Sequence, residues 1–145
     1  MGVEVEIVRE VDQELVDAFA VLLPQLSASA GPLDHAALDR VVRNEAITVL
    51  TARLDGRIVG TLTLVVFPVA TGTRARIEDV VVDAAARGRG IAAELTRHAL
   101  RLAGQAEART VDLTSRPDRA AANRLYERLG FRARNSTVYR FTGDR

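Results

Sequence analysis

The stretch IEDVVVDAAARGRGIA, residues 77–92, decides how this chain of 145 residues is interpreted. It begins with an apolar run, Ile77–Val82, of the kind that forms a strand. A loop containing Gly88 and Gly90 follows and leads into apolar residues at helical spacing. The first turn of a helix has unpaired N–H groups and a partial positive charge, and glycines let the backbone come close to an anion. The stretch therefore predicts a strand, a loop and a helix that together can hold a phosphate group.

Two arginines in this loop, Arg87 and Arg89, would add positive charge and bidentate donors. The alternative is an ordinary loop whose glycines serve a turn and whose arginines face water. These four residues alone do not decide between the two readings, so the flanking sequence has to.

The residues before this stretch predict an antiparallel meander. Two apolar runs, Ile47–Leu54 and Ile58–Val69, are joined by Asp55-Gly56, a dipeptide typical of a tight hairpin turn. A second turn leads to a strand from about Arg74 to Val82. Three neighbouring strands in the middle of the chain follow from this pattern.

The N-terminal residues predict one more strand and two helices. Val3, Val5 and Ile7 alternate with Glu4, Glu6 and Val8, as in a half-buried strand. Asp12 is positioned to cap a helix that Pro24 would end, and Asp34 is positioned to cap a second, shorter helix.

The residues after the stretch predict a helix from about Gly90 to Ala103, a short strand at Thr110–Leu113 and a helix at Ala120–Leu129, stopped by Gly130. The last strands are expected to begin at Phe131. The order of elements favours a single domain over residues 1–145, in which helices cover one mixed sheet.

The composition excludes several chemistries. The chain has no cysteine, which removes disulfides, thiolate metal sites and a cysteine nucleophile. All 20 basic residues are arginine, so neither a Schiff-base lysine nor a P-loop lysine is available. The two histidines, His35 and His98, lie far apart in sequence, and we expect no metal site.

The charge is balanced overall and uneven along the chain. The net charge is +1, which argues against nucleic-acid binding. Residues 1–72 hold an excess of acids and residues 73–145 an excess of arginine, so the second half favours an anionic ligand and the first half a cationic one. The apolar runs are too short to cross a membrane and the N-terminus is acidic, so we expect a cytoplasmic protein.

Two motifs resemble those of the GNAT superfamily, the acetyl-CoA-dependent N-acetyltransferases. The pattern Arg87-x-x-Gly90-x-Ala92, preceded by Val80–Val82, resembles the acetyl-CoA-binding signature of that superfamily. About forty residues further on, Ala122–Phe131 is similar to its second hallmark, a helix that bears a tyrosine and closes in Gly-Phe. The order of strands and helices is also similar over nearly the whole chain.

The resemblance implies an α+β fold with a mixed six- or seven-stranded sheet and four helices. The sheet would be splayed between the strand ending at Val82 and the strand at Thr110–Leu113, and acetyl-CoA would lie in the split. The backbone of three residues would pair with the pantetheine arm, and the amides of the loop would hold the pyrophosphate. The first set is Val80, Val81 and Val82, and the second is Arg87, Gly88, Arg89, Gly90, Ile91 and Ala92.

Two departures from the family pattern stand out. Many relatives have a proline and an aromatic residue before the loop, where this chain has Ala84–Ala86. An asparagine that often contacts CoA is replaced by Arg119, seven residues before Tyr126. Either Asn123 takes over that role or Arg119 reaches a phosphate of the nucleotide.

Glu78 is the predicted general base. It lies where relatives often carry a catalytic glutamate, and a period of two would place it on the strand face of Val80 and Val82. The same period would place Asp79 on the opposite face, which makes it the weaker candidate. The alternative for Glu78 is a structural ion pair with Arg76 or another arginine.

Tyr126 is the predicted general acid for the departing CoA sulfur, as the family match implies. The alternative is an aromatic side chain in the apolar stripe of its helix, together with Ala122 and Leu129. Because the chain has no cysteine, we expect direct transfer within a ternary complex rather than through an acyl-enzyme.

The expected activity is transfer of the acetyl group of acetyl-CoA to a primary amine, with a small-molecule acceptor favoured. Residues 67–83 are similar to the small glucosamine-6-phosphate N-acetyltransferases, while peptide and protein amines remain open. A non-catalytic acyl-CoA sensor on the same fold is the main alternative. A dinucleotide-binding domain is disfavoured because the third glycine of its motif is missing. A homodimer is compatible with the sequence, which does not fix it.

Overall fold

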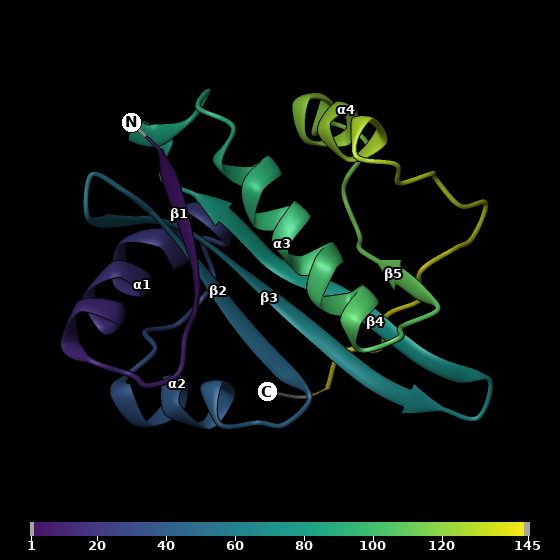
Figure 1. Ribbon diagram of the computed structural model, residues 1–145, viewed down its shortest axis with the longest axis horizontal. Coiled ribbons are helices and arrows are strands. Elements are labelled where there is room, and N and C mark those ends of the chain that lie inside the picture. Colours follow the sequence, from purple (N-terminus) through teal and green to yellow (C-terminus); the bar gives the residue numbers. More distant parts are fainter. Residues whose placement is uncertain (1, 144–145) are drawn as a thin grey trace. The chain divides into compact units, whose positions relative to one another are not determined.

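The computed structural model describes residues 2–143. The chain divides into two compact units, the first ending at Thr114 and the second beginning at Ser115. In the first unit the order is β1 (Val3–Ile7), α1 (Gln13–Leu26), α2 (His35–Val42), β2 (Ile47–Leu54), β3 (Arg57–Val69), β4 (Gly72–Val82), a short 3₁₀ turn (Ala84–Ala86), α3 (Ile91–Gln105) and β5 (Thr110–Asp112) (Figure 1). The second unit contains α4 (Ala120–Arg128).

The sheet has the strand order β1-β2-β3-β4-β5. Neighbouring strands among β1, β2, β3 and β4 are antiparallel, and β5 is parallel to β4. This is a mixed sheet with helices, so the predicted α+β fold class is confirmed.

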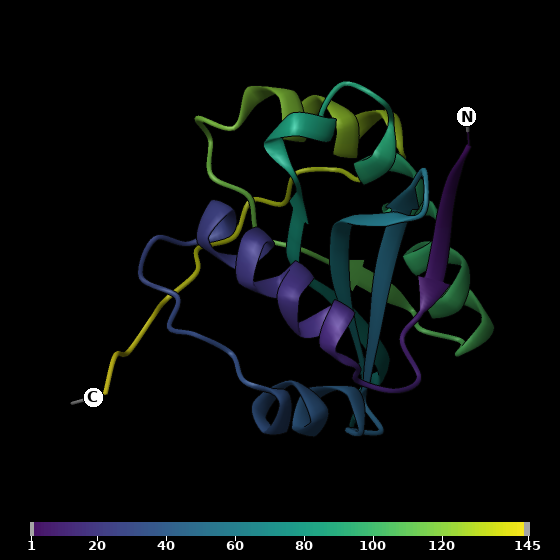
Figure 2. The same ribbon diagram turned by 90° about the vertical axis from the view of Figure 1, so that its left-hand side faces the viewer.

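The two faces of the sheet are covered by different helices. On one face, α1 and α2 pack on β2 in a cluster of buried side chains formed by Leu15, Phe19, Leu38 and Val49. On the other face lies α3, whose Ile91 and Leu95 are fully buried. Figure 2 shows α1 and α3 on opposite sides of the sheet.

The predicted helix starts in the first unit are confirmed. Asp12 Oδ1 accepts the Leu15 N–H at 2.9 Å, and Asp34 Oδ1 accepts the Ala37 N–H at 2.8 Å. The predicted end of α1 at Pro24 is wrong, because the helix continues to Leu26. A proline inside a helix loses its own N–H bond and crowds the carbonyl four residues before it. Only two helical residues follow Pro24, and bonds such as Ser27 N–H to the Leu23 carbonyl at 3.0 Å still close the last turn.

The predicted hairpin between β2 and β3 is also confirmed. Asp55 has a φ of 52° and Gly56 a φ of 81°. Two consecutive residues with positive φ form the kind of two-residue turn that matches the twist of paired strands.

The number of strands differs from the expectation. The sheet has five strands among the described residues instead of six or seven, and residues 131–143 contain no strand. Three apolar side chains of that segment, Val138, Tyr139 and Phe141, are exposed. A strand needs a hydrogen-bonded neighbour, which a local alternation of side chains does not supply.

Within residues 2–143, no helix has the length and apolar character needed to cross a membrane. The predicted cytoplasmic location and the single-domain organisation stay predictions.

Gly60 fixes how closely α3 approaches the sheet. A Cβ on this residue would lie 3.3 Å from side-chain atoms of both Ile91 and Leu95 and 3.3 Å from the Val81 carbonyl oxygen. These separations are shorter than ordinary van der Waals contacts, so the absence of a side chain on β3 lets the first turns of α3 pack directly on the strand.

We therefore expect Gly60→Ala to lower the free energy of unfolding by about 1–3 kcal/mol, the usual cost of overpacking a core. Gly104→Ala is the matched control. Gly104 lies in α3 with open space around it, so the added methyl group should raise stability by about 0.5–1 kcal/mol through helix propensity. Urea unfolding of both variants measures this, and equal effects of the two substitutions would contradict the close approach.

Candidate functional site

The strand β5 pairs with only a short region of β4. Arg74, Ala75 and Arg76 pair with Thr110, Val111 and Asp112. Beyond Arg76, β4 continues to Val82 with β3 on one side and, among the described residues, no strand on the other. Along Ile77–Val82, β4 therefore has one edge without a strand partner among residues 2–143, because β5 ends at Asp112, and this open edge is called the split below. The predicted splaying of the two strands stays a prediction.

A β-bulge in β4 lies inside the split. Thr63 of β3 pairs with Glu78, and Thr61 pairs with Val81, so Asp79 and Val80 together oppose Leu62. Asp79 has a φ of 52°, which is rare for a residue with a side chain. Bulges bend a strand and interrupt its hydrogen-bond ladder, and they occur often beside active sites.

The bulge overturns the predicted orientation of Glu78. Paired residues share a face of the sheet, so Glu78 lies on the same face as Val81, and Val82, which is paired with Gly60, lies on the other. The prediction that Glu78 shares a face with Val80 and Val82 assumed an unbroken period of two, and the extra residue in the bulge breaks that period.

The backbone of the split offers donors to a ligand. The Asp83 N–H donates to the Val59 carbonyl at 2.8 Å, toward β3. Because successive N–H groups of a strand point to opposite sides, the Val82 N–H is directed to the open side. An extended ligand can add to such an edge as a further strand.

The loop after β4 has the geometry predicted for an anion site. Gly88 and Gly90 have φ values of 80° and 75°, a region that favours glycine. Gly90 is the N-cap residue of α3 and provides no side-chain acceptor for the first N–H groups of the helix. Ile91 is buried and Ala92 half-buried, while Arg89 is exposed.

Neighbouring segments support this loop. Asp83 Oδ1 accepts the Ala85 N–H at 3.1 Å, and Gln25 Oε1 of α1 accepts the Ala84 N–H at 2.8 Å. Arg87 Nε donates to the Val82 carbonyl at 3.4 Å, which turns its side chain back toward β4. The triplet Ala84–Ala86, which departs from the family pattern, forms the 3₁₀ turn.

Glu78 forms an ion pair. Its Oε2 accepts a hydrogen bond from Arg76 Nε at 3.0 Å, and Arg76 Nη2 also donates to Thr114 Oγ1 at 3.2 Å. The side chain of Glu78 is 48% exposed, so it is open to a ligand. The structure thus contains the Arg76 contact that was the alternative for this residue.

Asp79 carries a second carboxylate next to Glu78. Partial burial raises the pKa of Asp79 above its ordinary value, and the negative charge of Glu78 raises it further. The bulge thus holds an exposed carboxylate in an uncommon backbone conformation beside a second carboxylate.

The second unit holds the other predicted site residues. The rings of Tyr126 and Phe131 make an edge-to-face contact with centroids 5.7 Å apart. Burial raises the pKa of the Tyr126 phenol, and the nearby Arg119 guanidinium opposes that shift. Arg119 is the N-cap residue of α4 and makes no side-chain cap. Asn123 Nδ2 donates to the Arg116 carbonyl at 3.1 Å, so this amide ties α4 to the preceding loop.

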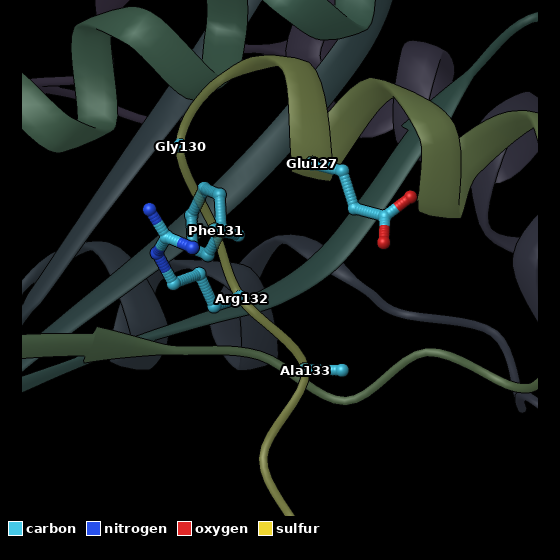
Figure 3. A pocket seen from close by; sticks show the side chains of 5 residues that line it. All are labelled: Glu127, Gly130, Phe131, Arg132 and Ala133. Carbon is cyan, nitrogen blue, oxygen red and sulfur yellow. The ribbon is translucent and has the colours of Figure 1, made fainter.

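Two features of the second unit were not predicted from the sequence. Ser115 Oγ is buried and has no hydrogen-bond partner among the described residues. A serine after a short strand carries no signal that separates it from any loop serine. A pocket of about 340 Å³ is lined by Glu127, Gly130, Phe131, Arg132 and Ala133, and none of these is a predicted site residue (Figure 3).

The open edge of β4 and the loop at the start of α3 fit the chemistry of acetyl-CoA. The cradle around Gly88 and Gly90 has room where a side chain would otherwise stand, and the first N–H groups of α3 can meet a diphosphate. The open side of β4 can meet the amide groups of a pantetheine arm. Among residues 2–143, no group of three or more His, Asp or Glu side chains is arranged to hold a metal ion.

Comparison with known proteins also indicates a protein that binds acetyl-CoA. Residues 10–131 match the model of the Acetyltransferase (GNAT) family. A Trypanosoma brucei acetyltransferase is 27% identical with a TM-score of 0.78, over 97% of this chain and 100% of that one. A Bacillus halodurans protein described as a transcriptional regulator is 29% identical with a TM-score of 0.78, over the same shares. None of the curated proteins compared with the chain matches it.

A more distant structure shows the same fold. An aminoglycoside acetyltransferase from an uncultured soil metagenomic sample, solved with sisomicin, is 18% identical with a TM-score of 0.85, over 99% of this chain and 97% of that one. The fold and the family match together define an acyltransferase that uses acetyl-CoA. The chain belongs to the GNAT acetyltransferase family.

The raised pKa of Asp79 predicts a pH-dependent effect of Asp79→Asn. Because the folded state disfavours the charged form, the native carboxylate destabilises the protein increasingly as the pH rises above its unfolded-state pKa of about 3.9. Asparagine tolerates the positive φ and removes the charge. We expect the variant to have a higher Tm than the native protein at pH 7 and a smaller advantage at pH 4.

Asp55→Asn is the control for this measurement. Asp55 has the same φ of 52°, but its sequence neighbours are Leu54 and Gly56 and no carboxylate adjoins it. If Asp79→Asn showed the same Tm difference at both pH values, burial and repulsion at the bulge would not be the cause.

Proposed function

We propose that this protein transfers the acetyl group of acetyl-CoA directly to a primary amine, with Glu78 as general base and Tyr126 as general acid. The observation that carries the proposal is the split, the open edge of β4 beyond Arg76, which leads to the glycine loop at the start of α3. A strand edge, a bulge and a helix N-terminus with no cap side chain follow one another along a single segment of chain.

The geometry of this segment supports the proposed cofactor-binding residues. Val80, Val81 and Val82 would align the pantetheine arm through their backbone. The loop from Arg87 to Ala92 would hold the diphosphate with its amides. Arg119 is exposed at the start of α4 and is better suited to a phosphate than Asn123, whose amide already bonds the Arg116 carbonyl.

Glu78 would take a proton from the acceptor amine. An alkylamine with a pKa of about 10.4 is mostly charged at neutral pH, and deprotonating it costs about 4–5 kcal/mol. A positioned base contributes a factor of about 10² to 10⁴ to the rate. The exposed Glu78 carboxylate lies at the start of the split, and Arg76 holds one of its oxygens, so the other oxygen is available for the amine or for a bridging water.

Tyr126 would give its proton to the leaving sulfur. The bound thioester supplies an activated acetyl group, and its C–S bond breaks as the C–N bond of the amide forms. The raised pKa keeps the Tyr126 phenol protonated at neutral and mildly alkaline pH, as a general acid requires. A charged acceptor amine loses two protons on becoming an amide. Glu78 would pass the first to solvent to give the neutral nucleophile, and the second, lost after the attack, balances the proton that the sulfur gains from Tyr126.

A non-catalytic acyl-CoA sensor is the second candidate function. The Arg76–Glu78 ion pair favours it, because a carboxylate committed to an arginine needs no catalytic role. The similarity to a protein described as a transcriptional regulator points the same way. Turnover decides between the two, since only the enzyme releases free thiol from acetyl-CoA when an amine is added.

Binding of the coenzyme is tested with Gly90→Ala. An alanine at a φ of 75° costs about 1–2 kcal/mol unless the loop shifts, so we expect CoA affinity to fall about tenfold in calorimetry. Gly104→Ala, in the same helix and away from the loop, should leave the affinity unchanged. Equal affinities for native protein and Gly90→Ala would remove the loop from the binding site.

Catalysis is tested with Tyr126→Phe and Glu78→Gln. Each should lower kcat by about 10² to 10⁴ with little change in acetyl-CoA affinity. Tyr139→Phe and Glu45→Gln are the matched controls, because Tyr139 is 91% exposed and Glu45 is also exposed, and neither is a predicted site residue. Thiol release followed over a panel of amines measures the rates, and an unchanged kcat in either test variant would exclude that residue from the chemistry.

A further inference from the structure

Before the bulge, β4 presents a row of three charged side chains on one face. Arg74, Arg76 and Glu78 alternate with Ala75 and Ile77, which are buried on the other face. Neighbouring members of the row are about 7 Å apart along a strand. The base is therefore the last member of a row whose other two members are arginines.

Arg74 is held by neutral groups. Its Nη2 donates to Thr71 Oγ1 at 2.9 Å and its Nη1 to Thr110 Oγ1 at 3.3 Å. None of the ion pairs formed within residues 2–143 includes Arg74. A guanidinium has five N–H donors, so most of those on Arg74 remain for a ligand.

A second arginine strengthens the positive charge at this end of β4. Arg109 Nη1 donates to the Thr71 carbonyl at 2.6 Å. Its stem crosses the β3–β4 turn where Gly72 has no side chain, since a Cβ there would lie 2.6 Å from Arg109 Cδ. Thr71 thus bonds two guanidinium groups, and both are fixed by neutral oxygens.

The row has a defined direction relative to the coenzyme loop. Figure 1 shows the β3–β4 turn at the end of β4 opposite to the residues that lead into α3. With the diphosphate at that loop and the thioester near Glu78, the remaining length of β4 on the far side of the base carries Arg76 and Arg74. An amine that reaches Glu78 from this side passes over both arginines.

We propose that Arg74 and Arg76 form a subsite for an anionic group, a carboxylate or a phosphate, on the amine acceptor. This inference rests on the proposed function and narrows its acceptor class to amines that also carry such a group. Guanidinium groups recognise both groups through paired hydrogen bonds.

The acidic residues on the same surface determine which arginine contributes most to binding the anionic group. Glu78 occupies the Nε of Arg76, and Asp112 of β5 stands beside Arg76 in register. Arg74 pairs in register with Thr110, which carries no charge. Arg74 is therefore the principal contact. The excess of acids in residues 1–72 favoured a cationic acceptor, but the charges that line β4 beyond the base have the opposite sign.

The experiment compares matched amines that differ only in the anionic group. Triglycine is compared with triglycinamide for a carboxylate, and glucosamine 6-phosphate with glucosamine for a phosphate. We expect kcat/KM from thiol release to favour the anionic member of at least one pair by tenfold or more. Arg74→Gln should reduce that preference about ten- to a hundredfold, the usual effect of losing a hydrogen bond to a charged group, and should leave kcat/KM for the neutral member unchanged.

Arg57→Gln is the control, because it removes the same charge from an exposed residue at the start of β3 and should keep the preference. Equal kcat/KM within both pairs, or a preference that survives Arg74→Gln, would overturn the inference while leaving the acetyltransferase function in place.

Calorimetry with the CoA-saturated protein separates the anionic subsite from the proposed catalytic function. Selective binding of the anionic member without any thiol release would support the subsite and contradict the catalytic proposal, and no selectivity in either measurement would overturn the subsite.

Discussion

The structure depends on the point at which β4 leaves β5. Three residues of β4 pair with β5, and the next six continue against β3 alone. The bulge at Asp79 lies within those six and changes which side chains face which layer. Strand edges inside a protein normally find a partner, because unpaired backbone groups away from water are costly. The edge of β4 from Ile77 to Val82 has no strand partner within residues 2–143, and we propose that the coenzyme completes it.

The surrounding elements hold this open segment in place. Gly60 lets α3 pack closely on the sheet, which fixes the start of that helix beside the end of β4. Gln25 of α1 bonds the chain just after β4 from the other face. The split is thus supported from both layers, and the loop with Gly88 and Gly90 continues directly from it. A preorganised site of this kind binds its ligand without first having to order a loop.

Most of this fold could be predicted because its signals are local. The caps at Asp12 and Asp34 and the turn at Asp55-Gly56 each depend on a few adjacent residues, and the structure contains all three. The glycine loop and the start of α3 are local in the same sense. The open strand edge followed from family resemblance, since no periodicity shows that two strands separate.

The wrong predictions concern features that depend on contacts between distant parts of the chain. The sequence of β4 shows no sign of the bulge, because Asp79 is neither glycine nor asparagine, so the face of Glu78 was assigned from an unbroken period. The strands expected after Phe131 required partners that the local alternation could not reveal. The contact of Arg109 with Thr71 joins residues 38 positions apart, which only the folded chain brings together.

Amide hydrogen exchange with and without acetyl-CoA tests the central claim most directly. If the coenzyme completes the open edge, the amide of Val82 and the first amides of α3 should exchange more slowly when it is bound, while the Asp83 amide, already bonded to Val59, should change little. Unchanged exchange at Val82 and at the start of α3 under saturating acetyl-CoA would contradict the account.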